Sequence, residues 1–177
     1  MLEQNQNAYD AYTVREAVIC GHRELEDLRV KRDAIYAKAD FTEEDGNIAA
    51  ELETRYGELG GYECEIDAES LLNNIGVDQA LFDVPMSEIE PKVKVKVLVA
   101  QSLFGKPDVL LLDEPTNNLD IKTVRWLQEY LKTLEDATVI IVSHNRHFLN
   151  QVCTHICDVD YNAINLFVGN YDFWYES

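Results

Sequence analysis

The chain has 177 residues, of which 46% are hydrophobic, so it can bury one substantial core and carry an extended appendage. No apolar run approaches the roughly 20 residues that span a bilayer, and residues 1–7 lack the basic and apolar regions of a secretory signal. The formal net charge of −18 repels nucleic acid and disfavours direct binding to it. The four cysteines are expected to be reduced thiols, which favours a cytoplasmic location without membrane contact.

The first part of the chain is predicted to be helical. A helix is expected over residues 14–32, because Thr13 and Glu16 form a capping box and apolar residues recur at helical spacing. A second capping signature at residues 42–45 begins another helix, which ends near residues 57–61. Two charged helices in succession indicate either a solvated helical hairpin or an arm that docks on a large partner.

Two further helices are expected before the first strand. One covers residues 66–74 and stops at Gly76. In the next segment, the Lys/Val alternation that follows Pro91 has the period of a strand. A proline in a first turn and the apolar residues that follow favour a helix instead, ending at Gly105.

The last part of the chain alternates strands with helices. Strands are expected at residues 109–112 and 138–142, a helix at 124–131 between them, and a short helix around Phe148. Residues 156–168 are predicted to form an antiparallel hairpin. The alternation of apolar runs and helices is typical of an α/β fold with a parallel sheet covered by helices.

Each of the two predicted strands ends in chemically reactive side chains. Asp113 and Glu114 follow the first strand, and Pro115 stops it; Ser143 and His144 follow the second. Because parallel strands end at the same edge of a sheet, the carboxylates and the imidazole are expected on one side. A carboxylate pair of this kind can hold a Mg²⁺ shell and orient a water molecule against a phosphate.

Residues 109–120, 143–149 and 169–172 together resemble the Walker B, D-loop and switch-histidine segments of ABC-F proteins, which are soluble twin-cassette ATPases of the translation apparatus. Residues 2–6 resemble the Q-loop, and Met86-Ser87-Glu88 resembles the altered signature of the first cassette in the YbiT-like branch. The resemblance covers the C-terminal part of one cassette.

This resemblance implies a fold and a domain organisation. The fold would be α/β, a partial P-loop NTPase-type parallel sheet with helices, plus an α-helical subdomain that bears an arm-like helical hairpin. Residues 1–90 would form the helical subdomain with the arm. Residues 91–177 would form the C-terminal part of the catalytic core.

The resemblance also implies roles for individual residues. Asp113 would hold Mg²⁺ through water, Glu114 would orient the attacking water, and His144 would contact the γ-phosphate of ATP. Gln4 would sense the Mg²⁺ and the water. All four residues would act on ATP within the same cassette.

Three more residues would act between two cassettes. Asn118 and Asp120 would form the D-loop, and the same residues also suit a turn that caps the helix beginning at Ile121. Ser87 would face the ATP of an opposing cassette, although Glu88 stands where the family usually has glycine. A carboxylate beside a triphosphate is unfavourable.

The P-loop pattern G-x-x-x-x-G-K-[ST] does not occur in the chain, and its one Gly-Lys pair, Gly105-Lys106, runs into Pro107. We therefore expect that the isolated chain does not turn over ATP. The partners expected are a second cassette or a complementary P-loop segment, with a ribosomal protein as a further partner. The alternatives are a non-enzymatic interaction module or pseudo-ATPase remnant, and a piece of a longer coding sequence without a separate function.

Overall fold

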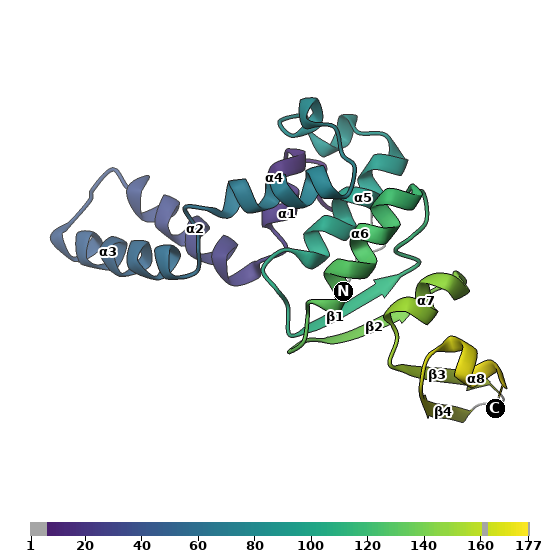
Figure 1. Ribbon diagram of the computed structural model, residues 1–177. Helices are drawn as coiled ribbons and strands as arrows, with labels where there is room; N and C mark the ends of the chain where they lie inside the picture. Colours follow the sequence, from purple (N-terminus) through teal and green to yellow (C-terminus); the bar gives the residue numbers. More distant parts are fainter. Residues whose placement is uncertain (1–6, 161–162, 177) are drawn as a thin grey trace. The chain divides into compact units, whose positions relative to one another are not determined.

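The computed structural model describes residues 7–160 and 163–176, which form two compact units. The first ends at Gly105, and the regular elements that the structure describes in it are helices, with one isolated bridge between Thr13 and Pro85. The second begins at Lys106 and contains the strands (Figure 1). Each unit is described by itself.

The core of the helical unit lies among α1 (Val14–Ile19), α4 (Cys64–Asn74) and α5 (Pro91–Leu103). Burial of apolar surface among these helices is the main source of their stability. The buried apolar side chains of the three helices include Val14, Ala17, Val18, Ala68, Leu72, Val97, Leu98, Val99 and Leu103.

Two 3₁₀ turns, η1 (Gln79–Leu81) and η2 (Met86–Glu88), connect α4 to α5. The guanidinium of Arg15, on α1, lies 2.8 Å from the carboxylate of Glu69 on α4 and 2.8 Å from that of Asp83 in this connection. One cation thus ties the connection and two helices together.

The predicted hairpin is present. Helices α2 (Arg23–Tyr36) and α3 (Glu43–Glu58) lie side by side and project as an arm (Figure 1). The capping signature is confirmed: the Thr42 hydroxyl accepts from the Asp45 N–H at 3.2 Å, and the Asp45 carboxylate accepts from the Thr42 N–H at 3.0 Å.

The single helix expected over residues 14–32 is wrong, because α1 ends at Ile19 and α2 begins at Arg23. Gly21 marks the break. A Cβ atom at this position would lie 2.0 Å from the backbone oxygen of Gln101 in α5. The Gln101 amide also donates to the backbone oxygen of Ala17 at 2.7 Å, and His22 caps α2 through Nδ1. Packing against α5 therefore decides where the helix breaks.

The conflict over the Lys/Val segment is resolved in favour of a helix, since α5 starts at Pro91 and stops before Gly105, whose φ is +79°. The compact units divide between Gly105 and Lys106, later in the chain than the boundary expected at residue 90. The reason is that α5 packs against α1 and α4 and so belongs to the helical unit.

In the second unit, β1 (Val109–Asp113) and β2 (Thr138–Val142) pair in parallel, and α6 (Ile121–Lys132) lies between them in the chain. Val109 is opposite Thr138, and Asp113 is opposite Val142. This register brings the carboxyl ends of both strands to one edge of the sheet, as the sequence predicts.

The rest of this unit contains α7 (Arg146–Val152), the antiparallel pair β3 (His155–Asp160) and β4 (Ala163–Val168), and α8 (Tyr171–Glu176). The hairpin confirms the prediction, whereas α8 is not predicted from the sequence. The amide of Asn150 donates to the Asp172 carboxylate at 2.7 Å and ties α7 to α8. No helix that the structure describes combines the length and the apolar character needed to cross a bilayer.

Candidate functional site

The predicted acidic pair lies where β1 ends. Asp113 is the last residue of the strand, and Glu114 follows it with φ of +46°. A positive φ is unfavourable for a residue with a side chain and is common at functional sites. The N–H of Glu114 donates to the backbone oxygen of Val142 at 2.8 Å, so one further bond across the sheet holds this conformation.

The Glu114 carboxylate is bound by the two residues that follow β2. One of its oxygens accepts from the backbone N–H of His144 at 3.1 Å, and the other lies 3.5 Å from the Ser143 hydroxyl. Nε2 of the His144 imidazole lies 3.5 Å from the first oxygen, and the imidazole is almost fully exposed. The structure therefore brings together Glu114 and His144, two of the residues predicted to act on ATP.

Ser143 has a part in this arrangement that the sequence analysis did not assign. Its hydroxyl oxygen accepts from the N–H of Asn145 at 3.0 Å, while Asn145 caps α7 by accepting from the N–H of Phe148 at 3.0 Å. Ser143 thus links the start of α7 to the Glu114 carboxylate. A serine directly before the histidine at a strand end is the signal that could have indicated this role.

The turn after Glu114 contains the predicted D-loop residues. Asn118 has φ of +62°, a conformation that asparagine tolerates better than most residues. The Asp120 carboxylate accepts from the N–H of Thr123 at 2.7 Å and caps α6. The capping role expected for this turn is therefore present.

The oxygen donors at this edge fit Mg²⁺. Asp113 and Glu114 are adjacent carboxylates, and Mg²⁺ is usually bound through one or two carboxylates with water and substrate phosphates completing the shell. Among the described residues no three His, Cys, Asp or Glu side chains gather into a metal cluster. The edge can therefore contribute to a Mg²⁺ shell that substrate and water complete.

Two predicted site residues are not part of this edge. Gln4 lies outside the described residues. Ser87 is exposed in η2, in the helical unit, and three residues separate it from Pro91 at the start of α5. It therefore does not occupy the first turn of that helix.

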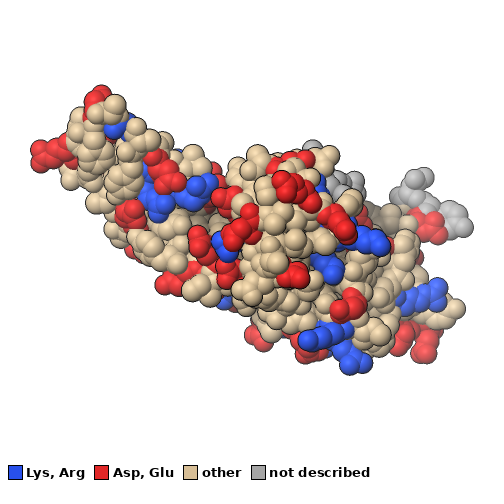
Figure 2. Space-filling view, turned by 90° about the horizontal axis from the view of Figure 1, so that it is seen from above, with Lys and Arg blue, Asp and Glu red and all other residues tan. Residues whose placement is uncertain are grey.

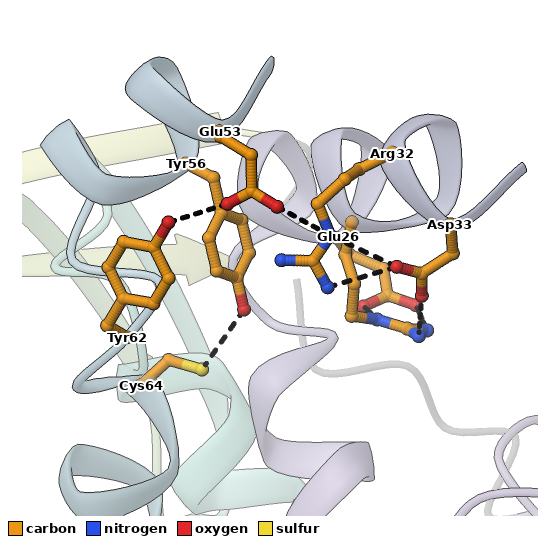
Figure 3. A network of polar contacts seen from close by, with 8 residues as sticks. Glu26, Arg32, Asp33, Glu53, Tyr56, Tyr62 and Cys64 are labelled. Carbon is orange, nitrogen blue, oxygen red and sulfur yellow. Dashed lines mark hydrogen bonds and ion pairs between the residues drawn. The ribbon is translucent and has the colours of Figure 1, made fainter. Parts of the chain in front are cut away.

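A polar network at the root of the arm was not anticipated from the sequence (Figure 3). The Tyr56 hydroxyl, on α3, lies 3.9 Å from Sγ of Cys64 at the start of α4. The Arg32 guanidinium, on α2, lies 4.6 Å from the centre of the Tyr56 ring. The Tyr62 hydroxyl donates to Glu53 at 2.5 Å. These contacts join both arm helices to the rest of the helical unit.

Comparison with curated proteins identifies relatives along the whole chain, although no family model matches it. The chain is 54% identical over 177 residues to the uncharacterized ABC transporter ATP-binding protein YkpA of Bacillus subtilis (strain 168), covering 100% of the chain and 33% of that protein. It is 51% identical over 171 residues to the probable ATP-binding protein YbiT of Escherichia coli O157:H7, covering 97% and 32%. The chain thus spans about a third of the length of these relatives.

More distant relatives point in the same direction. Elongation factor 3 of Mycosarcoma maydis is 42% identical over 106 residues, which are 60% of the chain and 10% of that protein. Mouse and human relatives, at 31% and 32% identity, are named as members of ATP-binding cassette sub-family F.

Among solved structures, the chain resembles the dimeric, post-hydrolysis state of the ATP-binding cassette MJ0796 bound to ADP and Pi. The TM-score is 0.58 at 18% identity, and the match covers 94% of the chain and 61% of the other. At this identity the likeness concerns the fold alone. It confirms the predicted α/β cassette fold.

Proposed function

Because the chain belongs to the ABC-F family of ATP-binding cassette proteins and forms part of one cassette, we propose that it supplies the water-orienting side of an ATP hydrolysis site. The intact protein would couple this hydrolysis to translation in the cytoplasm. The name of one relative, an elongation factor, supports the link to translation.

The observation that carries this proposal is the way in which Glu114 is held. Its carboxylate receives hydrogen bonds from Ser143 and His144, directly after β2, and its backbone has a positive φ that the sheet maintains. A carboxylate fixed in this manner can accept a proton or a hydrogen bond from a water molecule without reorganising. Pre-arranged polar groups account for most of the catalysis in phosphoryl transfer.

The other residues would then have separate tasks. Asp113 would bind the water shell of Mg²⁺, and the exposed imidazole of His144 would donate to a phosphate oxygen. Mg-ATP supplies the phosphorus that the water attacks. Gln4, Asn118, Asp120 and Ser87 keep the roles proposed above, with Ser87 acting toward an opposing cassette.

We further propose that the isolated chain has no turnover, because its sequence contains no P-loop pattern to bind the β-phosphate. Its partner would be a second cassette or a P-loop segment. The cassette structure that it resembles is a dimer, which supports this choice.

The test is Glu114→Gln in the intact protein that contains this segment. ATP binding should persist while hydrolysis falls at least about 100-fold, since the water loses its proton acceptor. Glu135→Gln, an exposed site in the same unit, is the matched control and should keep normal turnover. Equal hydrolysis by the Glu114→Gln variant and the wild type would refute the proposal.

An interaction module is the second candidate, and the end of the arm favours it. Tyr36 and Phe41 stack with ring centres 6.2 Å apart, and each remains about half exposed. Asp40, Glu43 and Glu44 lie close to them in the sequence, with Lys38 as the one basic residue between Tyr36 and Glu44. Such a surface suits a basic ribosomal protein. If the intact protein co-sediments with ribosomes but neither it nor the Glu114→Gln variant hydrolyses ATP, this second function is favoured.

A further inference from the structure

A cavity of about 160 Å³ lies at the root of the arm, within the helical unit. Its walls come from α1, α2, α3 and α4, and they include Cys20, Leu25, Tyr56 and Cys64. The polar network of Figure 3 runs along one side of it, through Tyr56 and Cys64. A molecule in this cavity would therefore contact both arm helices and the two helices at their root.

The charges that line the cavity do not balance. Three carboxylates, those of Glu16, Glu26 and Glu65, stand against the single guanidinium of Arg29. Arg29 is already paired: Glu26 binds it at 2.6 and 2.9 Å, and Asp33 at 3.2 Å. The Glu65 carboxylate has no hydrogen bond or ion pair with any residue that the structure describes. The cavity thus keeps an excess of two negative charges.

The two thiols and the Tyr56 phenol in the wall carry no charge, so they leave the negative balance of the cavity unchanged. Burial, and after it the neighbouring Glu26 carboxylate, raises the pKa of the Cys20 thiol to about 11. Burial raises the pKa of Tyr56 to about 12 and also raises the pKa of the Cys64 thiol. All three groups therefore stay neutral at physiological pH. Tyr12 and Tyr56 add aromatic surface, which attracts cations, and the Tyr56 ring already has the Arg32 guanidinium 4.6 Å from its centre.

We propose that this cavity is a binding site for a short alkyl diamine. An apolar cavity of about 150 Å³ holds benzene, a molecule of about six heavy atoms, so the volume suits a ligand of that size. Two ammonium groups would match the two negative charges that Arg29 does not balance, and the methylene chain would pack on Leu25 and Ile19. The site lies outside the ATP-binding residues and does not depend on the function proposed above.

The test is a calorimetric titration of butane-1,4-diamine into the purified 177-residue chain at fixed ionic strength. Saturable binding is expected, with none for the neutral isostere butane-1,4-diol. Glu65→Gln should weaken the affinity about tenfold. The matched control is Asp67→Asn, which removes one charge from the same helix without touching the cavity and should leave the affinity within about twofold. Equal weakening by both variants, or no saturable binding, would overturn the proposal.

Thiol labelling gives a second readout that needs no variant. Cys20 and Cys64 line the cavity, whereas Cys153 and Cys157 belong to the other unit. Bound diamine should slow the alkylation of the first two by iodoacetamide and leave the last two unchanged. Equal rates at Cys20 and Cys64 with and without diamine would contradict binding in this cavity.

Discussion

At the scale of single residues, the sequence identifies the candidate catalytic side chains but not the groups that hold them. Asp113 and Glu114 are recognisable because a carboxylate pair follows an apolar strand, which is a local pattern. The bonds from His144 N–H and Ser143 to Glu114 depend on the pairing of β1 with β2. That pairing joins residues about thirty positions apart, so no local pattern reveals these bonds.

Asp45 shows how one side chain can give the arm a pH dependence. Its hydrogen bond from Lys38, followed by those from Thr42, lowers its pKa to about 2, from an ordinary value of 3.8. A carboxylate with a lowered pKa stabilises the fold fully above its unfolded pKa. That contribution is lost as the pH falls from about 4 toward 2.

Asp45→Asn should therefore make the free energy of unfolding depend less on pH in the acidic range. In urea unfolding followed by circular dichroism, the wild type should lose more stability between about pH 4 and pH 2 than the variant. The control is Asp40→Asn, which removes a carboxylate from the same connection and leaves the capping box intact. If the wild type and Asp45→Asn lost the same stability over this pH range, Asp45 would not be the source of the pH dependence.

At the scale of elements, local signals predict where most helices begin, and tertiary contacts decide the exceptions. The capping boxes at Thr13 and Thr42 are both present. The break at Gly21 was missed because its cause is a helix about eighty residues further along the chain. The unpredicted α8 likewise depends on a contact with Asn150 of α7.

Two glycines of the helical unit should respond in opposite ways to alanine. Gly21→Ala would force a Cβ to within 2.0 Å of the Gln101 oxygen, so the chain should lose at least ~2 kcal/mol of stability. Gly46→Ala adds a methyl group inside α3 in ordinary contact with the Phe41 ring and should gain ~0.5–1 kcal/mol. Urea unfolding of both variants checks this pair. If both variants lost the same stability, α5 would not pack against Gly21 as closely as the structure indicates.

At the scale of the whole molecule, both units are acidic. Residues 3–105 carry 22 acidic and 10 basic side chains, and residues 106–177 carry 11 and 5. Figure 2 shows acidic side chains spread over the visible surface, with fewer basic ones between them. Like charges on a compact unit repel one another, so each unit is under self-repulsion at low salt.

Raising the salt concentration should therefore stabilise the chain. Exposed charges are screened strongly at a few hundred millimolar salt, and the free energy of unfolding should rise by ~0.5–1 kcal/mol between low and high NaCl. Urea, which is uncharged, is the suitable denaturant, and KCl should give the same result because screening does not depend on the cation. The opposing term is the loss of ion pairs such as those of Arg15 with Glu69 and Asp83. If stability fell as salt rose, these ion pairs would outweigh the repulsion of the eighteen excess negative charges.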